Sequence, residues 1–158
     1  MSDAYLWLKL VHIVSATVLF GTGLGTAFQM WMAHRSGDVH AVSTVARQVA
    51  WADFLFTMPA IIVQPASGFA LIRLAGFGPT ESWLLAAYVL YAVAGACWLP
   101  VVWIQWKVSR LAWAATQSQV PLPQHYFRLM RVWFWLGWPA FSAVLLIFWL
   151  MVAKPVLW

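Results

Sequence analysis

Four stretches of the chain are long, apolar and almost free of charge, and this pattern limits the possible folds more than any other feature. Between Lys9 and His34 the only ionisable side chain is His12, and between Arg47 and Arg73 it is Asp53. The ranges 82–106 and 132–153 contain no charged residue. About 20 apolar residues cross a bilayer as a helix, which satisfies its own backbone polar groups. We therefore expect an all-α, antiparallel bundle of four transmembrane helices.

The expected spans are 5–32, 48–72, 82–106 and 128–153, within one integral membrane domain over residues 1–158. The first apolar stretch is too long for a secretory signal peptide and is not followed by a small-residue cleavage site. The segment 108–119 is amphipathic, with Leu111 and Trp113 among polar residues, and we expect it to lie along the inner membrane surface.

Basic residues indicate the orientation of the bundle. The net charge of +5 does not point to nucleic acid, because the basic residues are divided among helix ends. Six Lys or Arg residues flank the connections 33–47 and 107–127, and three lie on the opposite side: Lys9, Arg73 and Lys154. Cytoplasmic loops carry the excess of Lys and Arg. We expect a bacterial inner-membrane protein with both termini on the periplasmic side.

Cysteine and loop histidines offer little for a metal site. Cys97 is the only cysteine, which excludes a disulfide or a thiolate metal cluster within one chain. His34, His40 and His125 fall in the inner connections, where we expect them to be solvated. At the depth of His12 there are too few donors for zinc or copper, which take three or four.

His12 is the only histidine inside a span, and an ionisable residue in the membrane is a candidate functional group. Helical spacing places Asp53, Thr57, Ala60, Gln64 and Ser67 on one stripe of the second span. The antiparallel arrangement brings further residues to the depth of His12 in the outer half. These are Gln64, Tyr88 and Tyr91, with Lys9 and Arg73 above them.

A haem fits this set of side chains. One neutral imidazole supplies an axial ligand, and cations near the rim meet the propionates. On this interpretation His12 binds the iron of haem b, and Lys9 and Arg73 hold the propionates. Gln64 with Tyr88 or Tyr91 lines the edge. Two other interpretations stay open: His12 is a hydrogen-bonded packing residue, or it contacts another ligand.

Asp53 and the glycines of the first span each allow more than one role. Asp53 is either neutralised by a basic residue of a neighbouring helix or acts as a proton relay from the cytoplasm. Gly21 and Gly25 have the spacing of close helix contacts, within the bundle or in a dimer, and also leave room for a flat ligand. Prolines within the spans free backbone carbonyls for other donors; they are Pro59, Pro65, Pro100 and Pro139.

Several phrases resemble a bacterial family of predicted integral membrane proteins of unknown function. The first is Leu8–Ser15 followed by Phe20–Gly23, and the others are 52–59, 64–68, 95–100 and 137–141. They extend over most of the chain. The resemblance implies a four-helix inner-membrane protein and supplies no activity.

The Leu8-Lys9-x-x-His12 opening also resembles the first helix of the bacterial membrane protoporphyrinogen oxidases and, more distantly, the membrane domains of copper-resistance proteins. In the oxidases the matching histidine ligates haem b, which implies the same role for His12. That family also uses a basic residue within a later span, where this chain has no lysine. The resemblance therefore supports haem binding more than protoporphyrinogen oxidation.

The sequence thus predicts a b-type haem protein in the bilayer with a redox role. The partners would be quinone, oxygen species or a porphyrin-type substrate, and the enzymatic form would be a haem-dependent membrane oxidoreductase. The alternative is a non-enzymatic carrier or scaffold subunit in which His12 and Asp53 are structural or proton-relay residues. A carrier would need a homo-oligomer to enclose a path, with Gly21 and Gly25 at the contact.

Overall fold

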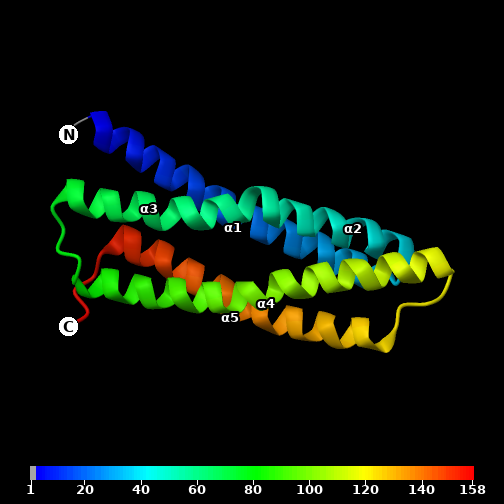
Figure 1. The fold of residues 1–158 in the computed structure, drawn as a ribbon. Helices are drawn as coiled ribbons and strands as arrows, with labels where there is room; N and C mark the ends of the chain where they lie inside the picture. Colours follow the sequence, from blue (N-terminus) through cyan, green and yellow to red (C-terminus); the bar gives the residue numbers. More distant parts are fainter. Residues whose placement is uncertain (1–2) are drawn as a thin grey trace.

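A computed structural model describes residues 3–158, and within them every regular element is helical (Figure 1). The elements are α1 (Asp3–Ser36), α2 (Val39–Ala52), the π-helical turn η1 (Asp53–Thr57), α3 (Met58–Ala75), α4 (Ser82–Ser118) and α5 (Gln124–Ala153). Because α2, η1 and α3 follow one another without a break, the described residues form four long rods. Each rod is long and apolar enough to cross a membrane. The expected all-α bundle of four spans is confirmed.

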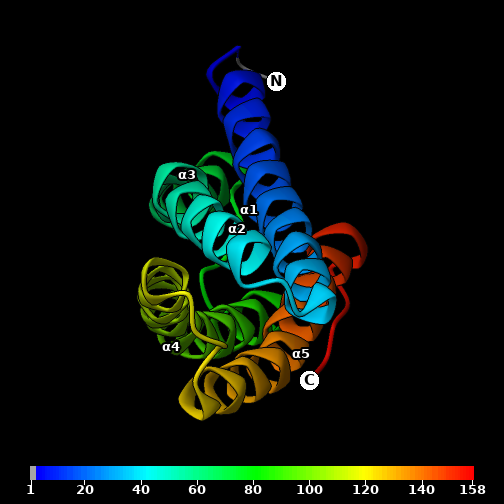
Figure 2. The same cartoon turned by 90° about the vertical axis from the view of Figure 1, so that its right-hand side faces the viewer.

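The rods run antiparallel, and both termini lie at the same end of the bundle (Figure 1). We call this the terminal end; it also contains the turn between α3 and α4. The opposite, distal end contains the α1–α2 turn and the α4–α5 connection. α1 packs mainly against α3 and α2, and α4 packs mainly against α5 and α2. At the terminal end α1 leans away from the other helices (Figures 1 and 2).

Local signals in the sequence set the two tight turns. Gly37, with a φ of +68°, ends α1, and the Asp38 carboxylate then accepts a hydrogen bond from the His40 backbone N–H at 2.8 Å to begin α2. Gly76, with a φ of +73°, ends α3. The next N–H, that of Phe77, returns to the carbonyl of Ile72 at 3.1 Å. This Schellman geometry requires a left-handed residue, for which glycine has no steric cost.

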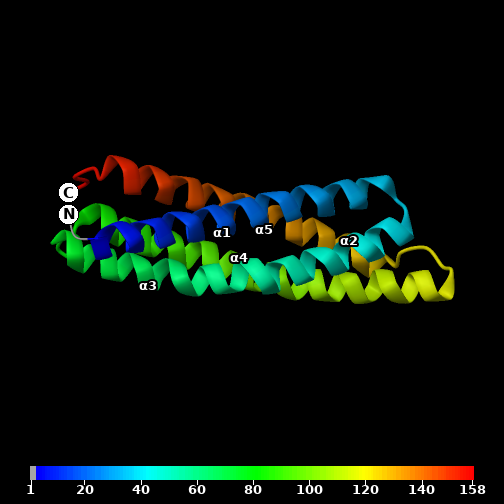
Figure 3. The ribbon, with the colours of Figure 1, turned by 90° about the horizontal axis from the view of Figure 1, so that it is seen from above.

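The largest buried apolar cluster lies toward the distal end. It includes Met30 of α1, Val42 and Val49 of α2, Val108 of α4 and Tyr126 of α5. α4 has 37 residues, which is about 55 Å at 1.5 Å per residue, against about 30 Å of bilayer hydrocarbon. The helices are therefore longer than the predicted spans, and most of the excess length is distal (Figure 3).

The prediction that the segment 108–119 lies along the membrane surface is wrong. α4 continues unbroken to Ser118, and the apolar face of the segment, Val108, Ala112 and Ala115, is buried inside the bundle. The segment is amphipathic, but its apolar face is covered by α2 and α5 rather than by lipid. His34 is likewise not a solvated loop residue, because its Nδ1 lies 3.0 Å from the hydroxyl of the buried Tyr126.

The glycines of α1 do not pack inside the bundle as a group. A Cβ added at Gly21 or Gly25 would meet no atom within 4 Å, and both residues are exposed. Only Gly23 faces a neighbour, the Phe141 ring of α5, at 3.8 Å. Phe20 adds edge-to-face contacts to α5, with its ring centroid 6.0 Å from that of Phe141. Aromatic packing, rather than a glycine seam, joins α1 to α5.

Candidate functional site

The His12 imidazole joins α1 to α3 through both of its ring nitrogens. Its Nδ1 lies 2.8 Å from the Ser67 hydroxyl oxygen, and that hydroxyl donates to the carbonyl of Val63 at 2.7 Å. Since a serine hydroxyl has only one proton, Nδ1 carries the hydrogen and donates it to Ser67. Nε2 then holds the lone pair and accepts from the Gln64 amide nitrogen at 3.2 Å. The imidazole is neutral, with a fixed tautomer.

Gly68 lets the ring lie against the backbone of α3. A Cβ at this position would lie 3.2 Å from His12 Cε1, closer than an ordinary van der Waals contact. Three residues after His12, the buried Ser15 hydroxyl donates to the carbonyl of Ala60 at 3.1 Å. α1 and α3 are thus joined by polar contacts over one turn of α1 and two turns of α3, within apolar surroundings.

Pro65 explains the position of Tyr91. A proline has no N–H, so the carbonyl of Ile61, four residues earlier, loses its helical partner. The Tyr91 hydroxyl of α4 donates to this carbonyl at 2.6 Å. The expectation that prolines free carbonyls for other donors is confirmed here, and Tyr91 acts as the substitute donor.

Two of the predicted site residues have a buried polar atom without a hydrogen-bond partner among residues 3–158. The atoms are Oε1 of Gln64 and the hydroxyl oxygen of Tyr88. The Tyr88 ring packs against Phe69 of α3, with centroids 5.6 Å apart. Of the residues predicted around His12, the structure therefore places Gln64 in contact with it. Tyr88 and Tyr91 face α3 from α4 and are not hydrogen-bonded to the imidazole.

The two predicted propionate partners lie nearer the terminal end and are exposed. Lys9 is one turn before His12 on α1, and Arg73 is on the last turn of α3. The ammonium group of Lys9 is 6.0 Å from the centroid of the Tyr5 ring. Neither residue forms an ion pair within the described part of the chain, so both are available to an anionic group.

Ser67 and Gly68 contact His12 without having been predicted as site residues. Ser67 lies on the same predicted stripe of the second span as Gln64, and this spacing is the signal that could have identified it. Nothing in the pattern marks Gly68, since a glycine that accommodates a ring from another helix looks like any other helical glycine. Its role follows only from the packing of α1 on α3.

Asp53 lies in a second buried polar group, at the turn where the helix widens. It is 4% exposed and begins η1, and its Oδ1 accepts a hydrogen bond from the Thr57 hydroxyl at 2.9 Å. The Gln105 side chain of α4 also lies beside the carboxyl group. The ring of Pro59 would crowd the carbonyl of Leu55, and the wide turn directly before it relieves that contact.

No basic residue within 3–158 forms an ion pair with Asp53, so the interpretation as a neutralised carboxylate does not hold. Lys107, a candidate partner on α4, instead places its ammonium group 4.6 Å from the centroid of the Trp103 ring. Arg47 and Arg131, the other candidates, are exposed. Amide and hydroxyl groups therefore replace a counter-charge around this carboxyl group.

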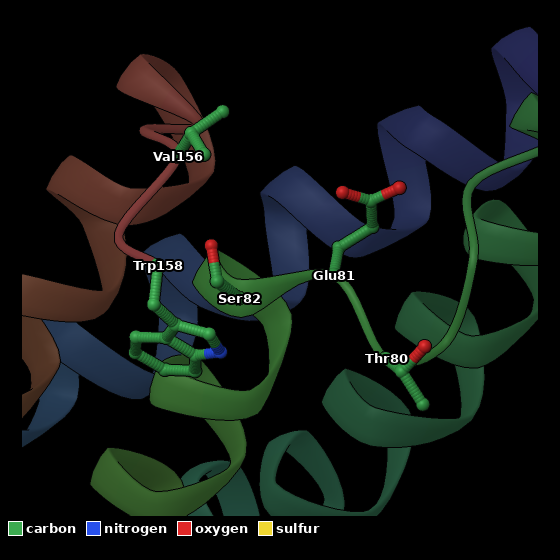
Figure 4. A pocket seen from close by; sticks show the side chains of 5 residues that line it. All are labelled: Thr80, Glu81, Ser82, Val156 and Trp158. Atoms are coloured by element: carbon green, nitrogen blue, oxygen red, sulfur yellow. The ribbon is translucent and has the colours of Figure 1, made fainter.

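Two surface hollows lie away from both polar groups. One, of about 330 Å³, is an open groove at the terminal end lined by Thr80, Glu81, Ser82, Val156 and Trp158 (Figure 4). The other, of about 310 Å³, lies on α1 beside Trp7 and Leu10. Residues 3–158 also contain no group of three or more His, Cys, Asp or Glu side chains arranged to hold a metal ion.

Comparisons with known proteins give a family and no activity. No match was found among curated proteins, and none among solved structures. The profile of one family, described as a predicted integral membrane protein (DUF2269), matches residues 6–155, which is nearly the whole chain. The match agrees with the four apolar rods and with the resemblance noted in the sequence. The chain therefore belongs to the DUF2269 family of integral membrane proteins.

Proposed function

We propose that the chain is a b-type haem protein of the bacterial inner membrane, with His12 as an axial ligand of the iron and a redox role. The observation that carries the proposal is the hydrogen bond from His12 Nδ1 to Ser67. Histidines that ligate metals commonly donate their other ring N–H to such an acceptor, which fixes the tautomer and makes the free nitrogen a better donor. In this chain Ser67 leaves Nε2 as the basic nitrogen.

Gln64 is the one group that covers Nε2. Its amide nitrogen is 3.2 Å from that atom, a long hydrogen bond, while its Oε1 has no partner. The amide is therefore held on one side only. An iron at Nε2 would take the place of one weak hydrogen bond, and the Gln64 amide would then be free to hydrogen-bond to the bound group.

The cations at the terminal end suit the acidic side of a haem. Lys9 is one turn from His12, and Arg73 is five residues beyond Gly68, or about 7.5 Å along α3. Both are exposed and without ion pairs in the described residues. We assign them to the propionates, and Tyr88, whose hydroxyl is buried without a partner, to the edge of the ring.

A bound haem b would supply one-electron chemistry, with quinone, oxygen species or a porphyrin-type molecule as the partner class. The chain itself provides the neutral imidazole, its hydrogen-bonded support on α3 and the flanking cations. Orientation follows from charge: six basic residues lie toward the distal end and three toward the terminal end. The distal end would therefore face the cytoplasm and both termini the periplasm.

The test is the visible spectrum of protein purified in detergent from cells with ample haem, oxidised and then reduced with dithionite. We expect a Soret band with reduced α and β bands, lost in His12→Ala. The matched control is His125→Ala, which removes an exposed histidine at the start of α5. A colourless protein, or a spectrum that survives in His12→Ala, would overturn the proposal.

The second candidate is a non-enzymatic carrier or scaffold subunit in which His12 holds α1 on α3. The observation in its favour is that both ring nitrogens already have partners on α3, and neither hollow described above reaches the imidazole. The two candidates differ in one result. A structural His12 gives a colourless protein that loses stability in His12→Ala, whereas a ligand His12 gives a coloured one.

A further inference from the structure

We propose that Asp53, Gln105 and Trp133 form a hydrated, proton-binding site inside the distal half of the bundle. One internal water would join Gln105 Oε1 to the indole N–H of Trp133, and the Asp53 carboxyl group would hold the proton. The site is separate from His12 and does not depend on haem binding. It assigns a ligand, water and a proton, to residues that the proposed function does not use.

Two side chains in this region have unsatisfied polar atoms. Gln105 is 3% exposed and Trp133 is 6% exposed, yet Gln105 Oε1 and Trp133 Nε1 have no hydrogen-bond partner in the structure. A buried polar atom without a partner costs about 1–3 kcal/mol. Native proteins therefore rarely leave such atoms unpaired, and an internal water is a common partner.

Of these two unpaired atoms, Gln105 Oε1 is an acceptor and Trp133 Nε1 is a donor. Oε1 of an amide accepts only, and an indole N–H donates only, so the two match opposite sides of a water molecule. Trp133 belongs to the same buried cluster as Ile104 and Val108, which lie one residue before and three residues after Gln105 on α4. The same cluster contains Val49, one turn before Asp53. All three polar residues thus border one packed region.

The Asp53 carboxyl group has polar neighbours but no counter-charge. Gln105 lies beside Asp53, and Thr57 donates to Oδ1 at 2.9 Å, but no cation pairs with the carboxyl group in the described residues. An unpaired carboxylate in an apolar interior is strongly destabilised and is neutralised by binding a proton. Uptake converts the carboxylate to a carboxylic acid, with the proton taken from water on the distal side, and release reverses this.

The charged and titratable groups of the surrounding helices do not replace that proton. His34 of α1 bonds to Tyr126, and Arg35 lies 5.2 Å from the centroid of the Trp31 ring. Lys107 of α4 lies over Trp103. The remaining basic residues near the distal end are exposed and point to solvent or headgroups; they are His40 and Arg47 of α2, Arg110 of α4, and His125, Arg128 and Arg131 of α5.

The ligand is small. Neither hollow described above touches Asp53, Gln105 or Trp133, and the surrounding cluster is closely packed. A water molecule fits such a site because it needs only two to four polar partners and little volume. The wide turn η1 begins at Asp53, so the backbone here departs from regular α geometry.

Infrared spectroscopy tests the proton directly, because the chain has only four Asp and Glu residues. Asp3, Asp38 and Glu81 are exposed, so at neutral pH only Asp53 should give the C=O band of a protonated carboxylic acid. We expect this band in a detergent without ester groups, with the usual shift in D₂O. It should vanish in Asp53→Asn and persist in Asp38→Asn. Absence of the band from the unmodified protein at neutral pH would overturn the proton site.

Two further variants test the water and protect against a folding defect in Asp53→Asn. Gln105→Leu and Trp133→Phe keep the carboxyl group and should shift its C=O band. The first removes the side chain beside Asp53, and the second removes the donor to the water that holds the Gln105 amide, which is then free to turn next to the carboxyl group. The matched controls Gln29→Leu and Trp138→Phe change exposed residues and should leave the band in place. An unshifted band in Trp133→Phe would overturn the water bridge. Loss of the band when Na⁺ or K⁺ replaces choline would identify a cation site instead and overturn proton binding.

Discussion

At the residue scale, the neutral imidazole of His12 is the feature on which most of the chemistry depends. Its two nitrogens are made different by α3: Ser67 takes the N–H, and Gln64 donates to the lone pair. A histidine held in this way keeps one basic nitrogen in a defined direction. Removing Ser67 and removing Gly68 should therefore have distinct effects, one on ligand binding and one on packing.

Ser67→Ala removes the acceptor of the His12 N–H and leaves the imidazole free to turn or to change tautomer. If His12 ligates haem, we expect haem affinity to fall about 10- to 100-fold, the usual effect of losing a supporting hydrogen bond. Haem titration of apo-protein measures this. The control is Ser142→Ala, an exposed serine of α5, which should titrate like the unmodified protein. Equal affinities in both variants would contradict the role of Ser67.

Gly68→Ala places a methyl group 3.2 Å from His12 Cε1, so the ring or α3 must shift. We expect the free energy of unfolding to fall by about 1–3 kcal/mol, the usual cost of overpacking. Gly95→Ala is the matched control, because an added Cβ there meets no atom within 4 Å. That variant should be neutral or more stable by up to about 1 kcal/mol. Denaturation in mixed micelles compares the two, and equal losses would show that His12 does not constrain position 68.

At the scale of elements, α3 combines a proline with a donor supplied by another helix. Pro65 leaves the carbonyl of Ile61 without a helical partner inside an apolar region, and the Tyr91 hydroxyl satisfies it. The wide turn before Pro59 is a second adjustment of the same rod. Each proline is thus accommodated by a different local solution. Such adjustments let the rod from residue 39 to 75 remain continuous.

Tyr91→Phe should destabilise the bundle by about 1–3 kcal/mol, because it leaves the Ile61 carbonyl buried and unpaired. In a Pro65→Ala background the helix recovers an N–H for that carbonyl, so the same change should cost less. A double-mutant cycle on unfolding free energies measures the difference, which we expect to be about 1 kcal/mol. Additive costs would show that the proline and the tyrosine act independently.

The elements also show where sequence reasoning succeeds and where it stops. Charge-free stretches predict the four rods, because the bilayer leaves a chain few other solutions. The stripe from Asp53 to Ser67 and the contact of Gln64 with His12 follow from helical spacing and antiparallel depth. The approach of Gly68 to His12, the donation from Tyr91 and the position of Gln105 beside Asp53 depend on the rotation of each helix about its axis. Packing sets that rotation, and no local pattern encodes it.

At the scale of the whole molecule, the bundle has a loosely joined terminal end and a well-packed distal end. α1 leans away at the terminal end (Figure 2). Toward the distal end α1, α2, α4 and α5 share one buried cluster that includes Met30, Val49, Val108 and Tyr126. The site around His12 and the site around Asp53 therefore differ in surroundings: one lies between two helices and the other lies beside a packed core.

Orientation can be tested with single cysteines in a Cys97→Ala background. Thr80→Cys lies in the terminal-end turn, and Val120→Cys lies in the distal connection; both positions are exposed. We expect a membrane-impermeant maleimide to label Thr80→Cys in intact spheroplasts and to label Val120→Cys only after lysis. The reverse pattern would place the termini in the cytoplasm.

The excess length of the helices has a practical consequence for imaging. When detergent encloses the whole of a 17.8 kDa protein, electron-microscopy particle images contain almost no protein feature by which they can be aligned. Here the rods are about 45–55 Å long, whereas the hydrocarbon layer around them is about 30 Å thick. The packed distal end should therefore extend beyond the micelle as a rigid part of the protein. A helical extension that continues α4 into the 119–123 connection would be held rigidly by the distal end. It would give a particle large enough to align.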